Sequence, residues 1–463
     1  MIEQALAQRV LEAALATGGD FSELFLEDTE SHAISMLDGT VENAAYRRKH
    51  GAGVRILKGE QCAYAYTADT SETALLETAR AAGAILSGAA AAKAGAFATV
   101  RPAAYAPEIP FDSIDNARRT ALLQRGTAAA KAVSPEISRV SASYGDVDQR
   151  ILVCNSQGVW AEDRRPRTRL SFDAVAAGNG GEYQTGAERP AAGKGFEAYA
   201  CIDPEEAGMQ AAKTAVTMLH APQCPAGFLP VAIDGGFGGV ILHEACVHSL
   251  EATAVAKGNS EFCGKLGQRI ASEKVTAIDD GTLPGEWGSI RVDDEGNPAQ
   301  RNVLIERGIL KSYLVDILGS RGMGHPVTGS ARRESYQYAP TSRMTNTFFA
   351  PGEDDEDEMI STMGEGLFAR RMGGGSVNPL TGEFNFAVLE GYWVRDGKIL
   401  TPVRGASLIG RGAEVLMAID RVSRRMWMGY GMCGSKSGSV PTNVGQPRIR
   451  VSGMTIGGKG GKL

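Results

Sequence analysis

The 463-residue sequence lacks long apolar runs, a basic charge and a high content of aromatic side chains. No window approaches the roughly 18 consecutive apolar residues that a membrane-spanning helix needs. The first residues carry Glu3 and Glu12, which a secretory signal peptide would not contain. The net charge of -6 offers no basic surface for nucleic acid, and aromatic residues make up 6%. We therefore expect neither a membrane nor a nucleic-acid partner.

Cysteine is scarce and shows no pairing pattern. The seven cysteines are scattered along the chain without a CxxC pair. Such usage is typical of a cytoplasmic protein with reduced thiols and argues against a disulfide framework.

The length and the periodicity of the chain predict two domains and an α+β fold. Residues 1–220 alternate helical and strand-type spacing, which predicts an α+β domain whose halves, 1–86 and 112–219, repeat one unit. The stretch 220–227 holds two prolines and is the expected boundary. Hairpin signals dominate 228–463, which predicts a mainly antiparallel β domain with a few helices.

One motif stands out in the second domain. The stretch "GGVILHEACVHSLEA", residues 238–252, contains His243, Glu244 and His248 with HExxxH spacing. This spacing is one residue longer than the HExxH of zinc protease helices. On a regular helix the two histidines lie about 140° apart, because each residue turns the helix by about 100°. An undistorted helix therefore cannot direct both to one ion.

Three interpretations follow from the motif alone. The histidines are unrelated residues of an ordinary helix, or a straight helix stacks Glu244, His248 and Glu251 around a metal. In the third interpretation a π-type bulge aligns His243 with His248 and leaves Glu244 free to act on water. The preceding "DGGFGG" favours a site, because glycine lets backbone segments approach closely.

The motif resembles the HExxxH helix of the TldD family, the TldD/PmbA group of DNA gyrase modulators and metallopeptidases. The similarity continues through residues 329–353, 370–416 and 431–458. The resemblance implies a zinc-dependent metallopeptidase that acts on flexible or unfolded peptides or processes a modified peptide precursor. It also implies that His243, His248 and Cys433 bind Zn²⁺, with Glu244 as the catalytic base.

Further residues near these blocks have more general roles. We expect Cys246 to be a packing residue, although it is a rival ligand, and Glu251 to orient an imidazole. In "SARRESYQ" a substrate carboxylate or backbone could bind Arg332, Arg333 and Tyr336, and solvent-exposed surface is the competing interpretation. The glycine run 373–375 carries no assigned role.

The resemblance further implies a dimer, either of two copies or with a PmbA/TldE-like paralogue that lacks the motif. Two other functions compete with the peptidase. One is a non-catalytic peptide-binding subunit of a TldD/PmbA-like complex. The other is a cysteine hydrolase that uses Cys433 with a histidine.

Overall fold

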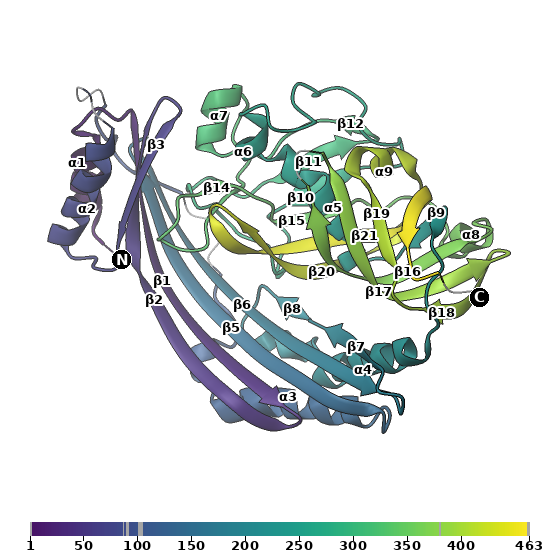
Figure 1. Ribbon diagram of the computed structural model, residues 1–463. Coiled ribbons are helices and arrows are strands. Elements are labelled where there is room, and N and C mark those ends of the chain that lie inside the picture. The colour runs from purple at the N-terminus through teal and green to yellow at the C-terminus, as the bar shows by residue number, and fades with distance from the viewer. Residues whose placement is uncertain (1, 87, 89–91, 101–104, 379–380, 461–463) are drawn as a thin grey trace.

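Two large sheets and the helices packed on them make up the chain (Figure 1). The computed structural model describes residues 2–86, 88, 92–100, 105–378 and 381–460. Most strand pairs are antiparallel, and the predicted α+β class is confirmed. Within these described ranges no helix is both long and apolar enough to span a bilayer.

The first sheet has eight strands in the order β3-β2-β1-β5-β6-β4, with β7 and β8 also paired to β6. Its long strands curve, and the C-terminal part of the chain lies on the concave side (Figure 1). The central pair β1–β5 is antiparallel from Glu23 opposite Asn155 to Leu37 opposite Ser141. The strands are β1 (Phe21–Leu37), β2 (Thr40–Lys58), β3 (Gln61–Thr67), β4 (Ala98–Val100), β5 (Ile137–Asn155), β6 (Val159–Ala177), β7 (Tyr183–Glu188) and β8 (Ala191–Ala192).

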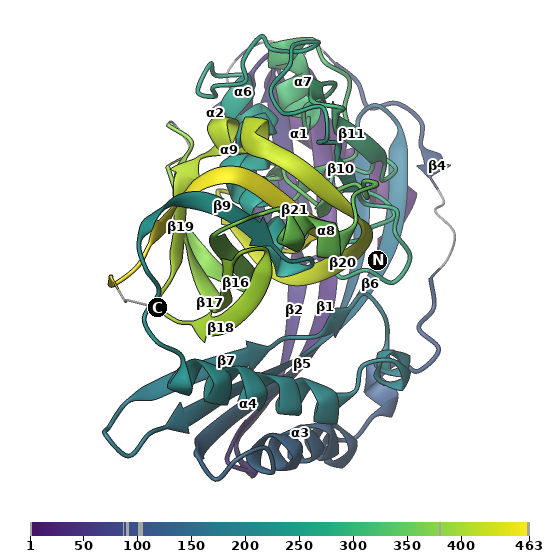
Figure 2. The same ribbon diagram turned by 90° about the vertical axis from the view of Figure 1, so that its right-hand side faces the viewer.

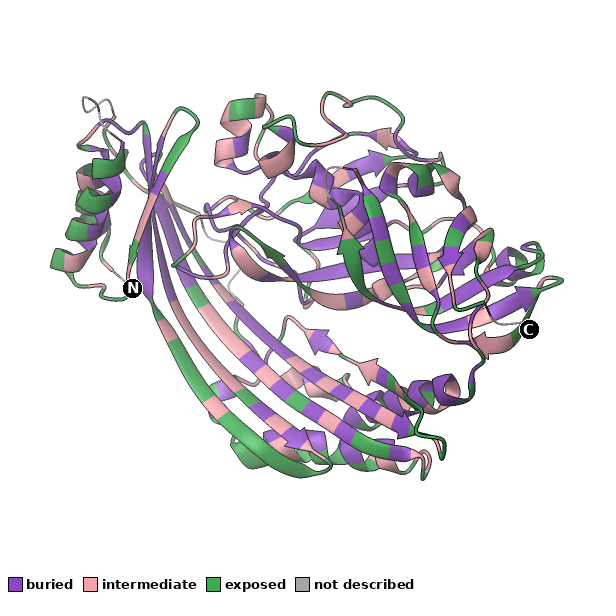
Figure 3. Cartoon of the chain, in the orientation of Figure 1, coloured by how far each residue is buried: buried purple, intermediate pink, exposed green. Residues whose placement is uncertain are grey.

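A pair of helices flanks consecutive strands twice in this sheet. The helices are α1 (Gln4–Leu15) and α2 (Glu72–Ile85), which flank β1 to β3, and α3 (Asn116–Lys131) and α4 (Pro204–His220), which flank β5 to β8, with short 3₁₀ turns η1 (Phe111–Ser113) and η2 (Phe196–Ala200). Buried residues of α1 and α2 share one hydrophobic cluster, and those of α3 and α4 share another. Figure 3 shows the buried face of the helices toward the sheet and exposed residues outside.

Local signals predicted several ends of these elements correctly. Asp38 and Gly39 have φ angles of 50° and 89° and form the β1–β2 turn, as their sequence predicts. Asp203 caps α4 by accepting a hydrogen bond from the Glu205 N–H. The spacing of "SELFLED" and "HAISML" predicts two separate short strands. This prediction is wrong, because both segments belong to the single strand β1, whose ladder with β5 continues between them.

The second sheet has eleven strands, and β21 pairs with four of them: β9, β15, β19 and β20. Figure 2 shows this sheet above α3 and α4. The strands are β9 (Gly227–Ile233), β10 (Ala277–Asp280), β11 (Arg301–Glu306), β12 (Ile309–Leu310), β15 (Asn346–Phe349), β16 (Gly366–Val377), β17 (Glu383–Arg395), β18 (Lys398–Val403), β19 (Ser407–Arg411), β20 (Ile419–Ser435) and β21 (Gly438–Gly457), beside a separate pair β13 (Ala331–Arg332) and β14 (Thr341–Ser342).

The helical segments of this part are short. They are η3 (Phe237–Gly239), α5 (Val240–Ala245), η4 (Val247–Leu250), α6 (Ala252–Val255), α7 (Ile317–Met323), α8 (Glu356–Ser361) and α9 (Gly412–Ala418). The apolar spacing of "DEMISTMGEGLF" and "AEVLMAIDRVS" predicts a helix in each segment, but only the first part of each is helical. Gly364, at a φ of 72°, follows α8 and leads into β16. Ile419 leaves α9 for β20, because it pairs with Val451 of β21.

Buried charges join the first sheet to the C-terminal part. Arg55 on β2 is 1% exposed and lies 2.7 Å from Glu23 on β1 and 2.7 Å from Glu295. Asp163 on β6 contacts Arg165 at 3.0 Å and the Nε of Arg291 at 2.7 Å. Each charge loses its hydration on burial, and its ion-pair partner compensates for that loss.

Candidate metal centre

Glycines set the approach of the motif helix to the sheet. The chain leaves β9 through Gly235 and Gly236, the latter at a φ of 72°. A Cβ on Gly239 would lie 2.6 Å from the backbone nitrogen of Gly445 on β21. A side chain at this position would push α5 away from the sheet, so the expected role of the glycine-rich stretch in close backbone approach is confirmed.

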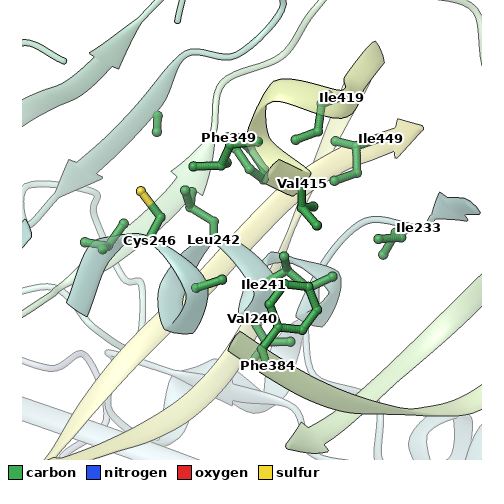
Figure 4. Packing of buried hydrophobic residues seen from close by; sticks show 14 of the residues in the cluster. Ile233, Val240, Ile241, Leu242, Cys246, Phe349, Phe384, Val415, Ile419 and Ile449 are labelled. Atoms are coloured by element: carbon green, nitrogen blue, oxygen red, sulfur yellow. The ribbon is translucent and has the colours of Figure 1, made fainter. Parts of the chain in front are cut away.

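Apolar packing then fixes α5. Val240, Ile241 and Leu242 are at most 6% exposed and belong to the cluster that also contains Phe384 and Val415 (Figure 4). Since these side chains occupy the buried faces of a helix of only six residues, the orientation of His243 is set by the hydrophobic core.

The motif helix breaks at Cys246. This residue has φ -133° and ψ -60°, outside the helical region, and the 3₁₀ turn η4 follows it. The π-type bulge is therefore wrong: a break, not a widened turn, redirects the chain. The carbonyl of Ala245 lies against Gly412, where a Cβ would approach to 1.9 Å, so the start of α9 abuts the end of α5.

The break brings the two histidines to one thiol. His243 Nε2 lies 3.2 Å from Cys433 Sγ, and His248 Nε2 lies 3.3 Å from the same sulfur. The ligand atoms of the three residues lie within 4.8 Å of one another. The imidazole rings stand almost perpendicular, at 86°. The histidines are thus neighbours in space and not unrelated residues of an ordinary helix.

This donor set fits zinc. Zinc binds imidazole nitrogen at about 2.0–2.1 Å and thiolate sulfur at about 2.3 Å, which separates nitrogen from sulfur by about 3.5 Å in a tetrahedron. The observed separations of 3.2 and 3.3 Å are close to this value. Three protein donors leave a fourth position, as catalytic zinc sites do.

Glu244 lies beside these donors on the more open side. Its Oε2 is 3.8 Å from His248 Nε2, and its side chain is 32% exposed. Burial raises the pKa of Glu244, and the nearby Glu251 carboxylate raises it further, against the opposing effect of His248. A carboxyl group with a raised pKa is a stronger base once ionised.

The two imidazoles differ in their protonation. Burial lowers the pKa of His243 well below its ordinary value, so this ring is neutral and its Nε2 can donate to a metal. Burial also opposes charge on His248, but Glu251 and Cys433 outweigh it and raise the pKa of His248 well above the ordinary value. Metal binding at His248 therefore displaces a proton.

Glu251 and Cys246 both lie outside the group of His243, His248 and Cys433. Glu251 Oε1 lies 3.3 Å from His248 Nδ1, the nitrogen that faces away from Cys433. It therefore lies outside the three-residue donor cluster and can orient the ring. Cys246 is fully buried among apolar side chains and does not belong to the cluster (Figure 4).

Comparison with known proteins gives the family of this chain. Family models match residues 22–86, 109–219 and 226–458, described as PmbA/TldA metallopeptidase domain 1, central domain and C-terminal domain. The chain belongs to the PmbA/TldA metallopeptidase family. The resemblance to TldD is thereby confirmed.

Relatives with metalloprotease names match this chain over different lengths. The metalloprotease TldD homolog of Haemophilus influenzae is 35% identical over 95% of this chain and 93% of its own length. A protein named zinc metalloprotease TldD homolog, from Saccharolobus solfataricus, is 32% identical over 53% of this chain and 55% of its own.

Solved structures share the fold. A Thermotoga maritima protein described as a modulator of a DNA gyrase has a TM-score of 0.80 at 20% identity and covers 98% of this chain and 100% of its own. TldE from Thermococcus kodakarensis has a TM-score of 0.75 at 17% identity, covering 95% and 97%.

Elsewhere in this PmbA/TldA chain, the predicted substrate residues have structural contacts. Arg332, Arg333 and Tyr336 are 2%, 3% and 6% exposed. Arg333 bonds to Glu23 of the first sheet, and the Tyr336 N–H donates to Glu27 at 2.8 Å. Arg333 and Tyr336 thus join the two parts of the chain, whereas Arg332 donates to the carbonyls of Met344 and Pro441 within the C-terminal part. Their role in substrate binding stays a prediction.

Arg343 was missed by the sequence analysis. It is fully buried and donates to the backbone carbonyl of Cys433. Its Nε lies 3.9 Å from Glu251 Oε1. The only sequence signal was its position inside the block 329–353, because the periodicity around an isolated arginine does not reveal a partner 90 residues away.

The glycine run 373–375 borders a cleft of about 930 Å³. Gly373 and Gly374 line the cleft, and a Cβ on Gly375 would lie 2.1 Å from the carbonyl of Asn385. Residues 234–238, which precede α5, and 427–432, which precede Cys433, line it as well. The cleft therefore runs along the two segments that lead to His243 and to Cys433.

Proposed function

We propose that this chain is a zinc-dependent peptidase of the TldD type that hydrolyses flexible or unfolded peptides or processes a modified peptide precursor. The observation that carries the proposal is the convergence of His243, His248 and Cys433, with Glu244 beside them. The first two belong to one broken helix and the third to a strand 185 residues beyond His248. A fold that joins them across such a distance supports a working centre.

The chemistry follows from the placement of these groups. Zinc, when bound, acts as a Lewis acid and lowers the pKa of water. Glu244 is the side chain positioned to take a proton from the attacking water and to return it to the leaving amine. Its partial exposure, next to the 19% exposed His248, leaves a path for substrate.

The recessed position of the centre favours a flexible substrate. His243 and Cys433 are 3% and 4% exposed, so only the Glu244 side is open. An extended segment reaches such a centre, whereas the surface of a folded protein does not. The cleft beside residues 373–375 offers apolar and charged side chains to such a segment, among them Trp427, Met432 and Arg371.

We also propose that the protein works as a dimer, either of two copies or with a TldE-like paralogue. Two features support this: the fold shared with TldE and apolar side chains left exposed on the second sheet. These include Phe228 at 73%, Leu400 at 54% and Ile399 at 45% exposure. Exposed apolar surface of this kind is typical of protein interfaces.

Glu244→Gln tests the peptidase. We expect the variant to keep about one zinc per chain and to lose hydrolysis of unstructured peptides by at least about 100-fold, because the general base is gone. Zinc is measured by plasma mass spectrometry and products by peptide mass spectrometry. Glu414→Gln, an exposed position on α9, is the control and should keep its activity.

Other outcomes point to the competing functions. Hydrolysis that persists in Glu244→Gln contradicts the proposal. A wild-type protein that binds peptides without metal, with an affinity that ignores Glu244, is a binding subunit. Activity that survives chelation and is lost on alkylation of Cys433 indicates a cysteine hydrolase.

A further inference from the structure

Arg343 holds the strand that carries the sulfur ligand. One of its terminal nitrogens donates to the Cys433 carbonyl, and the other donates to Ser437 Oγ and to the Gly438 carbonyl, each at 3.0 Å. Three acceptors on the β20–β21 hairpin thus meet one guanidinium. Its planar fork of donors fixes the hairpin at the position where Cys433 turns its sulfur toward the histidines.

The same guanidinium faces the carboxylate behind the second histidine. Arg343 Nε is 3.9 Å from Glu251 Oε1, which is itself 3.3 Å from His248 Nδ1. Within the described part of the chain neither Arg343 Nε nor Glu251 Oε1 has a hydrogen-bond partner. Both side chains are at most 5% exposed, so water does not compensate their charges, and Glu251 faces both Arg343 and the His248 ring.

We propose that Arg343 is a positioning residue that sets the zinc affinity of the centre, acting on Cys433 through its backbone and on His248 through Glu251. This inference rests on the proposed zinc site and adds to it the group that couples two ligands from different segments. Neither of these two interactions requires Arg343 to touch the metal. Its charge also offsets the negative charges of a thiolate and of Glu251, which would otherwise repel each other.

Arg343→Lys and Glu251→Gln are the test variants. Lysine keeps the charge but loses the fork, whereas glutamine keeps the shape but loses the charge. Arg332→Lys is the matched control, because Arg332 is equally buried and donates to the carbonyls of Met344 and Pro441 without contacting Glu251 or Cys433. Partners that orient metal ligands typically change affinity by about 10–100-fold.

Zinc dissociation constants of the full-length proteins, measured by competition with a chelator at fixed pH, give the first readout. We expect binding to weaken by about 10–100-fold in Arg343→Lys and in Glu251→Gln, and by less than about threefold in Arg332→Lys. The second readout is the absorption spectrum of the Co²⁺-loaded proteins. The thiolate and ligand-field bands should shift in Arg343→Lys and stay unchanged in Arg332→Lys.

The spectrum separates positioning from simple loss of stability. A merely destabilised variant binds cobalt in fewer molecules but gives the wild-type bands. Wild-type affinity and bands in both Arg343→Lys and Glu251→Gln overturn the inference while leaving the zinc site intact. A wild-type protein that binds no zinc overturns the proposed function itself. Should Arg343→Lys fail to fold, Glu251→Gln alone decides, since its shape matches the native residue.

Discussion

Two cysteines of this chain have different surroundings and therefore different expected chemistry. Cys433 faces His243 and His248, while Cys246 is fully buried within the apolar core. Burial raises the pKa of the Cys246 thiol far above its ordinary value, which keeps it protonated and unsuited to metal binding. We therefore expect Cys433, and not Cys246, to be the third metal ligand.

Cys433→Ser should reduce bound zinc from about one per chain to a small fraction after dialysis, because two imidazoles alone hold zinc weakly. Cys246→Ser should keep the zinc and lower the free energy of unfolding by about 1–3 kcal/mol, because a hydroxyl is buried in an apolar site. Plasma mass spectrometry and urea unfolding measure the two effects. Full zinc occupancy in Cys433→Ser would disprove the assigned ligand.

Sequence reasoning reached these residues only in part. The spacing of His243 and His248 suggested a distortion, but helical geometry could not say which one. The assignment of Cys433 came from the family resemblance, because no local pattern relates it to the motif. Arg343 stayed hidden for a similar reason: its partners come from segments that meet only in the folded chain.

At the scale of elements, the contact of α5 with α9 controls the broken helix. Gly412→Ala places a Cβ 1.9 Å from the carbonyl of Ala245, so α5 or α9 has to move. We expect a loss of about 1–3 kcal/mol in unfolding free energy, together with weaker zinc binding. Chemical unfolding and chelator competition measure both.

Gly434→Ala is the control for this variant. Gly434 adjoins the ligand Cys433, yet a Cβ there meets nothing within 4 Å. Its zinc affinity should therefore equal that of the wild type. A normal zinc affinity in Gly412→Ala would show that the contact between α5 and α9 does not govern the site.

The ends of elements could be predicted where contacts within a few residues determine them, but not where pairing in the sheet determines them. Asp38-Gly39 fixed a hairpin and Asp203 fixed a helix start, both through contacts within a few residues. The prediction that the helix continues beyond Ala418 was wrong, since pairing of Ile419 with Val451 overrides helix propensity. The break at Cys246 could not be predicted from local sequence either, because the adjacent Ala245 carbonyl lies against Gly412, which is far along the chain.

At the scale of the whole molecule, buried ion pairs hold the concave sheet to the C-terminal part. Burial raises the pKa of Asp163, but Arg165 and Arg291 outweigh it and keep the pKa below its ordinary value. A depressed folded pKa contributes stability above the unfolded value of about 3.9, and this contribution is lost as the pH falls through the folded pKa. The predicted domain boundary at 220–227 remains a prediction beside this evidence for close association.

Asp163→Asn should lower the unfolding free energy by about 3 kcal/mol at pH 7, because the buried Arg165 and the partly exposed Arg291 both lose a counter-charge. The difference from the wild type should stay constant down to about pH 5 and shrink below about pH 4. Urea unfolding across this range checks both parts.

Asp173→Asn is the corresponding surface control. Asp173 pairs with Arg189, both more than 40% exposed, and the change should stay below about 1 kcal/mol. Equal destabilisation by the two variants would contradict a special role for the buried pairs.

Because β21 pairs with four strands, the geometry of the proposed metal centre depends on the register of this strand. This strand supports Gly239 before the motif helix, aligns β15 just after Arg343, and carries Cys433 on its hairpin partner. A slip of one residue would move these groups by about 3.4 Å and turn side chains to the opposite face. Such a molecule could remain compact but would have lost its metal donors. Metal occupancy would then distinguish correctly aligned molecules from misaligned ones, so that a misfolded copy is an inactive one.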